Sequence, residues 1–237
     1  MDHPGLLVTG GGQRIGLHVA EEFLSRNIPV YVTYRTERDS IMRLRESGAI
    51  CIYADFSTNE GIEAFIHRLK QHKPSLSTVI HNASAWAAEK NAQDVAGLMD
   101  GLMNVHVKAP YLINLALADS LVPGKSGGAD IIHMTDFVAG KGSAKHIAYA
   151  ASKAALENLT LSFAARLAPR IKVNSIAPAL IMFNESDDEA YKKKALDKSV
   201  MQLVPGPEEV MEAIDFIMSS RYMTAQTIHL NGGRNVR

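Results

Sequence analysis

The chain has 237 residues, 46% of them hydrophobic, with 25 acidic and 25 basic side chains. This length suits one α/β domain with a large core. Zero net charge argues against nucleic acid or a membrane surface as a partner, because both attract basic proteins, so small neutral ligands are expected. The single cysteine, Cys51, excludes an internal disulfide and fits a reducing compartment, where it is expected to be a buried strand residue.

The amino-terminal residues 1–5 lack a basic region, and the apolar run that follows them is short. A secretory signal needs both features, and no other stretch approaches the length of a membrane span. We therefore expect a cytoplasmic protein without a membrane segment. Cys51 belongs to no metal-ligand cluster, and no metal site is predicted.

Seven short apolar runs have the character of strands and alternate with helical stretches. They cover residues 6–9, 29–34, 50–54, 78–81, 130–134, 171–176 and 226–230. Strands that alternate with helices form parallel sheets with helices on both faces. Residues 1–237 are therefore predicted to form a single α/β domain with a doubly wound parallel sheet of the Rossmann type.

The first predicted strand runs into a glycine-rich turn at residues 9–16, which opens a helix. Glycines permit a tight turn, and the start of a helix offers free N–H groups and a positive dipole to a phosphate. Gly10, Arg14 and Ile15 are therefore predicted to bind a dinucleotide. The spacing is not Gly-x-Gly-x-x-Gly, because Ile15 takes the last glycine position. Arg14 is either a phosphate clamp or a solvated charge.

The second predicted strand ends in Arg35 and Thr36. NAD sites usually place an acidic residue here to accept from the ribose 2′-hydroxyl, whereas a cation and a hydroxyl suit a 2′-phosphate. NADPH is the predicted cofactor, and Glu37 keeps NAD open as an alternative. The third predicted strand ends at Asp55, which could accept from the adenine amino group or cap the next helix.

The fourth predicted strand ends in Asn82, Ala83 and Ser84, and Trp86 follows. Small residues let the backbone approach a cofactor closely, and Asn82 can bond both the backbone and a ligand. Trp86 is the only tryptophan. It either packs against the protein or stacks on a flat heterocycle.

Residues 91–122 are predicted to form a long helical stretch, with a kink at Pro110 and His106 near its middle. A single helical histidine is more often a hydrogen-bonded core group than a catalyst.

The strand at 171–176 leads to a turn that includes Pro178 and Ile181, which could hold one face of a nicotinamide. Residues 182–206 then form a predicted lid, in which Phe183 is the candidate substrate contact. Acidic residues precede the lysines at 192–194, which is typical of a solvated helix; holding an anionic tail is the alternative.

Tyr149 and Lys153 lie four residues apart on a predicted helix over 148–167, so they share a face. A cation beside a phenol favours the phenolate, which lowers a pKa that is ordinarily about 10. Tyr149 is therefore a candidate general acid. The preceding strand ends at Thr135 and Asp136, where open α/β sheets place their ligands.

Together these motifs resemble the short-chain dehydrogenase/reductase family across essentially the whole chain. The matching elements are the glycine-rich turn, Asn82-Ala83, Tyr149-x-x-x-Lys153, Asn174 and Asn231-Gly232-Gly233, in the family's order and spacing. The resemblance implies that Tyr149 is the proton donor. It also implies that Lys153 binds the nicotinamide ribose and lowers the Tyr149 pKa.

Three residues depart from the family's usual pattern. Arg14 stands where most members have a third glycine, Ser84 where they have glycine, and Asp136 where they have a catalytic serine. That serine donates to a substrate carbonyl, whereas an ionised aspartate only accepts and would repel a developing alkoxide. Asp136 suits a substrate with ring N–H or amino donors and a ring nitrogen to protonate. Thr135 is the alternative hydroxyl if the strand is read one residue out of register.

This combination resembles the pteridine reductase branch of the family. The resemblance implies hydride transfer from NADPH to C6 of a 7,8-dihydropterin, with a proton to N5 from Tyr149, directly or through water shared with Asp136. Arg14, Trp86 and Phe183 would contact the substrate, with Trp86 sandwiching the pterin against the nicotinamide. The motifs at 81–86, 148–153 and 174–178 resemble those of branch members that act on dihydromonapterin, which the resemblance implies as the substrate. Dihydrobiopterin and dihydrofolate are kept as alternative substrates, because the lid determines which pterin side chains the site accepts.

Two other functions are kept as alternatives: a carbonyl or 3-oxoacyl thioester reductase, and a non-catalytic NADP-binding sensor. Arg14 and Trp86 weigh against the first, and the Tyr149/Lys153 pair weighs against the second. His106 aligns with the family's helix asparagine, so a proton-relay water would be held differently or lost. The resemblance also implies a homotetramer, built on the 91–122 and 148–168 helices and the carboxyl-terminal strand.

Overall fold

The computed structural model describes residues 3–124 and 126–236. Of the amino-terminal segment considered above, Met1 and Asp2 lie outside the described residues. Within the described part, no helix is both long enough and apolar enough to span a membrane. The same residues contain no group of three or more His, Cys, Asp or Glu side chains placed to hold a metal ion.

Seven parallel strands form one sheet in the order β3-β2-β1-β4-β5-β6-β7. Their bounds are β1 Gly5–Thr9, β2 Val30–Tyr34, β3 Ile50–Tyr53, β4 Leu76–His81, β5 Ala129–Met134, β6 Ile171–Pro178 and β7 Thr227–Leu230. The order reverses between β1 and β4, which is where doubly wound sheets bind ligands. The predicted fold class is confirmed.

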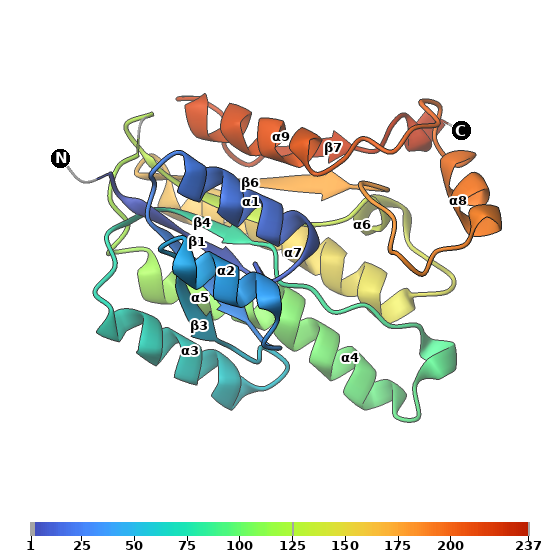
Figure 1. The fold of residues 1–237 in the computed structure, drawn as a ribbon, viewed down its shortest axis with the longest axis horizontal. Coiled ribbons are helices and arrows are strands. Elements are labelled where there is room, and N and C mark those ends of the chain that lie inside the picture. The colour runs from blue at the N-terminus through green and yellow to red at the C-terminus, as the bar shows by residue number, and fades with distance from the viewer. Residues whose placement is uncertain (1–2, 125, 237) are drawn as a thin grey trace.

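Helices cover both faces of the sheet (Figure 1). The helices of the described residues are α1 Arg14–Ser25, α2 Asp39–Glu46, α3 Asn59–Gln71, η1 Glu89–Asn91, α4 Val95–Met103, η2 Asn104–Lys108, α5 Ala109–Leu117, α6 Val138–Lys141, α7 Ile147–Leu167, α8 Glu189–Leu196, α9 Glu208–Ser219 and η3 Arg234–Val236. Successive strand residues point to opposite faces. On β1, Leu7 joins the core shared with α3, α5 and α7, whereas Leu6 and Val8 join the core shared with α1, α2 and α9.

Two segments differ from the sequence-based expectation. The helical stretch expected over 91–122 runs from α4 to the end of α5, and it is interrupted at η2, which is π-helical. A π-helix widens the turn and re-aims its side chains, so the irregularity lies before Pro110 rather than at it. Strand β6 extends to Pro178, beyond the predicted end at 176, because it pairs with β7 up to Leu230.

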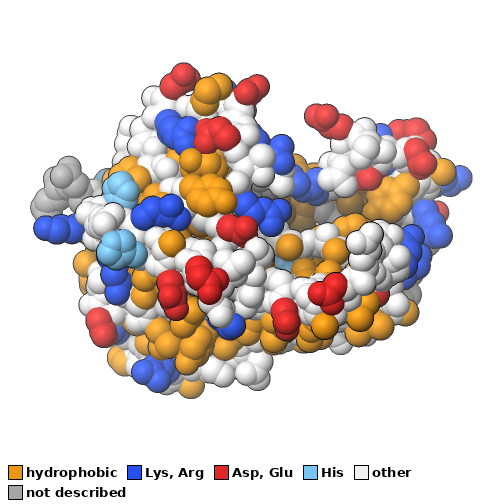
Figure 2. Space-filling view, turned by 90° about the horizontal axis from the view of Figure 1, so that it is seen from below, with side chains coloured by type: hydrophobic (Ala, Val, Ile, Leu, Met, Phe, Trp, Pro, Cys, Tyr) orange, Lys and Arg blue, Asp and Glu red, His pale blue; other side chains and the backbone are white. Residues whose placement is uncertain are grey.

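Charges are distributed as the neutral composition suggests. Figure 2 shows one face of the molecule, on which acidic and basic side chains are interspersed rather than gathered into a single basic stripe. That face therefore lacks the electrostatic footprint of a nucleic-acid binding surface.

Candidate active site

A cleft of about 860 Å³ opens at the carboxyl ends of the strands. It lies where the sheet order reverses, and α8 stands beyond the end of β6 (Figure 1). Every residue proposed for the site from sequence, except Phe183, lines this cleft: Gly10, Arg14, Ile15, Arg35, Thr36, Asp55, Asn82, Ala83, Ser84, Trp86, Asp136, Tyr149, Lys153, Pro178 and Ile181.

Asp136 and Tyr149 are directly hydrogen bonded. The Tyr149 hydroxyl donates to Asp136 Oδ2 at 2.8 Å, and Asp136 Oδ1 accepts the Val138 backbone N–H at 2.9 Å. The second bond fixes the carboxylate at the start of α6. Thr135 takes no part in this pair, because its hydroxyl is buried and donates to the Ile176 carbonyl at 3.1 Å. The residue facing the phenol is therefore Asp136, not Thr135.

The Tyr149 pKa is raised, which is the opposite of the predicted direction. Burial is the main cause, followed by the charge of Asp136 and its hydrogen bond, while a hydrogen bond with Ser84 acts in the other direction. Lys153 does not offset these effects here, because its Nζ donates to the Met134 carbonyl at 2.8 Å and lies 5.7 Å from the centre of the Tyr149 ring. Tyr149 is thus held as a protonated phenol.

Lys153 is almost completely buried, at 3% exposure. Burial lowers the Lys153 pKa to about 8, and the charge of Asp136 opposes that shift. Near neutral pH the ammonium form still predominates, so Lys153 brings a positive charge beside the Asp136–Tyr149 pair.

His106 links two parts of the site from behind. Its Nε2 accepts the Ala85 backbone N–H at 3.2 Å, so the ring proton lies on Nδ1, which is 2.8 Å from Ser152 Oγ. The Ser84 hydroxyl is 2.9 Å from the same Nε2. Ser152 in turn donates to the Tyr149 carbonyl at 2.8 Å. His106 therefore joins the loop after β4 to the helix that carries Tyr149.

The His106 imidazole is held neutral. Burial, together with the charge of Lys153, lowers its pKa to about 2. A neutral ring can accept on one nitrogen and donate on the other, as the two hydrogen-bond chains require. The π-helical turn of η2 contains this residue. His106 is therefore a hydrogen-bonded core histidine, which is the more common role of a single helical histidine.

Trp86 stands at the mouth of the cleft with 66% of its surface exposed. Its ring centre lies 4.4 Å from that of His146, with the planes tilted by 40°. The indole is therefore supported on one side without being packed into the core. An exposed aromatic surface of this kind can stack on a flat ligand.

At the β1 end, the glycine-rich turn lies against β4. Gly10 has a φ of +67°, and a Cβ there would lie 2.7 Å from the Ala83 Cα. Asn82 Nδ2 donates to the carbonyls of Thr9 and Gly10 at 3.1 and 3.0 Å, which ties the turn to the end of β4. Only glycine allows this approach, so the floor of the cleft is bare backbone.

Arg14 begins α1 with a φ of +54°. Its guanidinium donates to the Met182 carbonyl at 3.1 Å and to the side chain of Asn184. It is thus not a free solvated charge but a tether between the glycine-rich turn and the predicted lid. A left-handed conformation is unfavourable for a side chain of this size, which points to a functional reason for arginine at this position.

Phe183 is not brought to the cleft. Its ring packs edge-on against Tyr191, with ring centres 6.4 Å apart. Its neighbours Met182 and Asn184 line the cleft instead, as does Tyr191. The irregular segment that carries Phe183 has no repeating pattern, so the sequence does not tell which of its side chains faces inward.

At the β2 end, Arg35 and Thr36 are exposed and are joined by Arg38, which sequence reasoning missed. The available signal was a second arginine close behind the predicted strand end. Glu37, the residue that kept NAD open, forms an ion pair with Arg45 and does not line the cleft.

Asp55 does not cap the following helix. Thr58 is the N-cap of α3, while Asp55 Oδ1 accepts the backbone N–H and hydroxyl of Ser57 at 3.0 and 2.8 Å. These bonds, with the charge of Arg35, lower the Asp55 pKa. Asp55 keeps its second oxygen for other donors.

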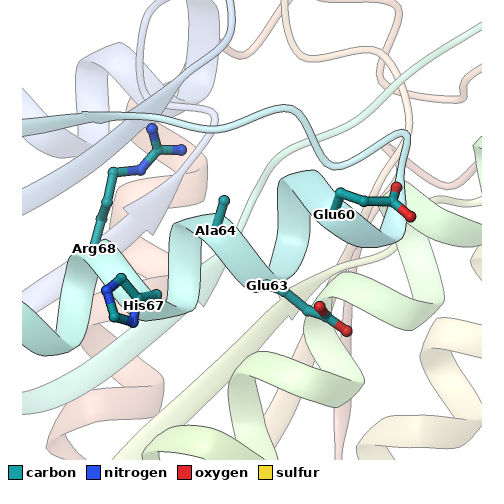
Figure 3. A pocket seen from close by; sticks show the side chains of 5 residues that line it. All are labelled: Glu60, Glu63, Ala64, His67 and Arg68. Atoms are coloured by element: carbon teal, nitrogen blue, oxygen red, sulfur yellow. The ribbon is translucent and has the colours of Figure 1, made fainter.

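A second hollow, of about 430 Å³, lies on the outer surface of α3. All the side chains that line it come from this one helix: Glu60, Glu63, Ala64, His67 and Arg68 (Figure 3). The two carboxylates lie toward one end of the helix segment and Arg68 at the other. Polar groups do not converge there, so it does not compete with the cleft as an active site.

A family model described as enoyl-(acyl carrier protein) reductase matches residues 11–235. The chain belongs to the short-chain dehydrogenase/reductase family. Members similar to it over nearly the full length include the dihydromonapterin reductases of Klebsiella pneumoniae, at 51% identity over 98% of this chain and 97% of the relative, and of Escherichia coli K12, at 49% over 98% and 97%.

Solved structures of the family show the same architecture. One is FolM alternative dihydrofolate reductase 1 from Brucella canis complexed with NADP, with a TM-score of 0.86 at 26% identity, covering 100% of this chain and 95% of that one. The corresponding Brucella suis protein in complex with NADP also has a TM-score of 0.86 at 26% identity, covering 99% and 96%. The family predicted from the motifs is confirmed.

Proposed function

We propose that the chain catalyses the NADPH-dependent reduction of a 7,8-dihydropterin, dihydromonapterin foremost, to the tetrahydropterin. The observation that carries this proposal is the 2.8 Å hydrogen bond from Tyr149 to Asp136 in a cleft bordered by Trp86. The carboxylate offers hydrogen-bond acceptors to the ring N–H and amino groups of a pterin. Reduction of a simple ketone would instead call for a hydrogen-bond donor to the carbonyl oxygen. Relatives 49 to 52% identical, named dihydromonapterin reductase, support it.

Each substrate-facing group has a separate task. Trp86 stacks on the pterin ring. Arg14 holds the start of the lid, at Met182 and Asn184, beside the ring. Asp136 orients the pterin through its free acceptor capacity. Tyr149 passes its proton to N5, directly or through water shared with Asp136. The raised pKa of Tyr149 favours the protonated donor in the resting enzyme, and Asp136 and Tyr149 titrate as a coupled pair.

The cleft also suits a dinucleotide. The close approach of Gly10 to Ala83 leaves bare backbone beside the start of α1, where a pyrophosphate binds favourably. Arg35 and Arg38 form no ion pair within the part of the chain that the structure describes, so their charge is available for a 2′-phosphate, to which the Thr36 hydroxyl can also donate.

The remaining lining residues would complete the cofactor site. Ile15, Asn82, Ser84, Pro178 and Ile181 line the cleft between its two ends, and Asp55 lies near the adenine end. Lys153 would hold the nicotinamide ribose. When bound, NADPH supplies the hydride that reaches C6 of the pterin.

The test follows NADPH absorbance with purified protein and three substrates in parallel: 7,8-dihydromonapterin, 7,8-dihydrofolate and a 3-oxoacyl thioester. The proposal expects the fastest turnover with the dihydropterin and little or none with the thioester. Turnover of the thioester alone would make Asp136 incidental and favour the carbonyl reductase. Tight NADPH binding without oxidation by any substrate would favour a non-catalytic sensor.

We further propose a homotetramer in the cytoplasm. Tyr111 and Leu115 on α5 and Leu161 on α7 leave apolar surface exposed on the helices that the family resemblance assigns to subunit contacts. The thiol of Cys51 is free, which agrees with a reducing compartment. Light scattering of the purified protein gives its mass, and a monomer at micromolar concentration would contradict the assembly.

A further inference from the structure

Basic side chains gather on the substrate side of the cleft. Lys198 and Arg234 line it directly. The Arg234 guanidinium lies 5.1 Å from the centre of the Phe137 ring, and the Lys141 ammonium lies 5.6 Å from the same ring. Phe137 follows Asp136 in the chain, so these cations border the proposed site of chemistry.

Two further lysines extend this group. Burial lowers the pKa of Lys198, and the positive charges of Arg234, Lys194 and Lys145 lower it further. We call Lys141, Lys145, Lys194, Lys198 and Arg234 the rim cluster. None of the five forms an ion pair with another residue in the ranges 3–124 and 126–236. Like charges placed together without partners repel one another, and an anionic ligand relieves that repulsion.

One acidic side chain of the lid, Asp187, is hydrogen bonded to Asn184 and forms no ion pair with the rim cluster among the described residues. Asp187 lines the same cleft, but its Oδ2 accepts the Asn184 backbone N–H at 2.8 Å and also lies near the Asn184 amide. The lysines that the sequence placed in the lid are only partly involved. Lys192 pairs with Glu189 at 2.7 Å, so it belongs to the solvated face of α8.

The rim cluster is separate from the cations proposed for the cofactor. Arg35 and Arg38 follow β2, whereas Phe137 and its cations follow β5, and the strand order β2-β1-β4-β5 puts three strand spacings between them. At about 4.8 Å per spacing, the two groups lie about 14 Å apart along the sheet edge. One small anion cannot contact both.

We propose that the rim cluster binds an anionic group, a phosphate or a carboxylate, on the side chain of the pterin substrate. The inference rests on the proposed pterin reduction, with Trp86 and Asp136 holding the ring and the tail extending toward Lys198 and Arg234. Arginine and lysine bind both anions through charge-assisted hydrogen bonds. The rim cluster then contributes to turnover of a dihydropterin whose side chain carries an anionic group, and does not contribute to turnover of a neutral one.

The experiment measures kcat/KM for three substrates: neutral 7,8-dihydromonapterin, its monoester with a phosphate on the terminal side-chain hydroxyl, and 7,8-dihydrofolate with its glutamyl carboxylates. The variants are Lys198→Gln, Arg234→Gln and the double substitution, and the matched control is Lys193→Gln, an exposed lysine of α8 that does not line the cleft. NADPH dissociation constants and circular dichroism spectra are recorded for each.

The ratio of kcat/KM for an anionic substrate to that for the neutral one is expected to fall about tenfold in the double variant and to fall with added salt. The ratio is expected to stay unchanged in Lys193→Gln. If kcat/KM falls in the double variant for the phosphate ester, the rim cluster is a phosphate site. If it falls for dihydrofolate, the rim cluster is a carboxylate site.

Three results would overturn the inference. A ratio that is the same in wild type and double variant would show that the rim cluster does not contact the substrate, while neutral turnover would leave the proposed function standing. If the double variant binds NADPH more weakly and the ratio does not change, the cations would be assigned to the cofactor. Absence of turnover with all three dihydropterins would overturn the proposed function and the anion site together.

Discussion

The two ends of the cleft are built in contrasting ways. At the β5 end, Asp136, Tyr149 and Lys153 are hydrogen bonded, and Tyr149 and Lys153 are buried. At the β2 end, Arg35 and Arg38 are exposed. Groups that move a proton gain from fixed positions and low solvent access, whereas groups that bind a phosphate need free charge until the ligand arrives. Substitutions at the two ends should therefore damage different steps.

The largest effect is expected for Tyr149→Phe. The ring and its packing remain, but the proposed proton donor is lost. We expect kcat for dihydropterin reduction to fall by about a thousandfold, within the usual range for loss of a general acid. The NADPH dissociation constant, measured by fluorescence titration, should change far less. A variant that keeps most of its kcat would show that the proton comes from another group.

The β2 end is probed by Arg35→Asp. This change removes a proposed phosphate partner and introduces repulsion, so NADPH affinity should fall by about 50-fold while NADH affinity changes little or improves. With saturating cofactor, kcat should be retained. Glu37→Gln serves as the control, because Glu37 already pairs with Arg45 outside the cleft. Equal loss of NADPH and NADH affinity would place the 2′-phosphate elsewhere.

His106 tests whether the loop that carries Trp86 depends on support from behind. His106→Ala removes the acceptor of the Ala85 N–H and the donor to Ser152, which costs about 2 kcal/mol of folding stability. We expect kcat/KM for the dihydropterin to fall about tenfold through KM. His106→Asn, which retains a donor and an acceptor, should recover part of the loss. Equal kinetics for wild type and His106→Ala would limit the histidine to a role in stability.

The last prediction concerns acid stability rather than catalysis or cofactor binding. Burial lowers the pKa of His81 to about 4, of His106 to about 2, and of His133 well below its ordinary value. In the unfolded chain each pKa is about 6.5, so below that pH the unfolded chain binds protons that the folded protein excludes. The contribution of these histidines to the free energy of unfolding is therefore fully present above about pH 6.5. As the pH falls below that value, the free energy of unfolding decreases by about 1.4 kcal/mol per pH unit for each histidine, until the pKa of that histidine in the folded protein is reached.

Urea unfolding between pH 7 and pH 5 measures this dependence. His81 and His133 share Asn114, with His81 Nε2 at 2.7 Å from its Oδ1 and the Asn114 amide at 3.1 Å from His133 Nε2. His81→Gln keeps a donor but does not titrate, so its stability should fall less steeply with decreasing pH than that of the wild type. Stability independent of pH across this range would contradict the neutral assignment of these rings.

Sequence and structure agree best where short motifs lie at strand ends. The residues near Asn82, Asp136 and Tyr149 were found because parallel strands bring their carboxyl ends to one edge, whatever the loop lengths. The pKa of Tyr149 was predicted in the wrong direction, because burial and the distance to Lys153 are properties of packing rather than of spacing along the chain.

Other features could not be read from the sequence for related reasons. Phe183 lies in an irregular segment, where no period tells which side chain faces inward. Lys198 comes from the lid and Arg234 from the carboxyl-terminal region, and only the fold brings both to one cleft. The π-helical turn that places His106 leaves no periodic signal, since the flanking residues keep their helical pattern.

The central claim is that Asp136 recognises a pterin ring and does not merely support the fold. The most direct test compares Asp136→Ser with the wild type in two measurements: kcat for 7,8-dihydromonapterin and the dissociation constant of NADPH. Asp100→Ser, an exposed change on α4, is the matched control. The account predicts that pterin turnover falls by about a hundredfold while NADPH affinity is nearly unchanged. Equal losses in both would contradict it and make Asp136 a structural residue.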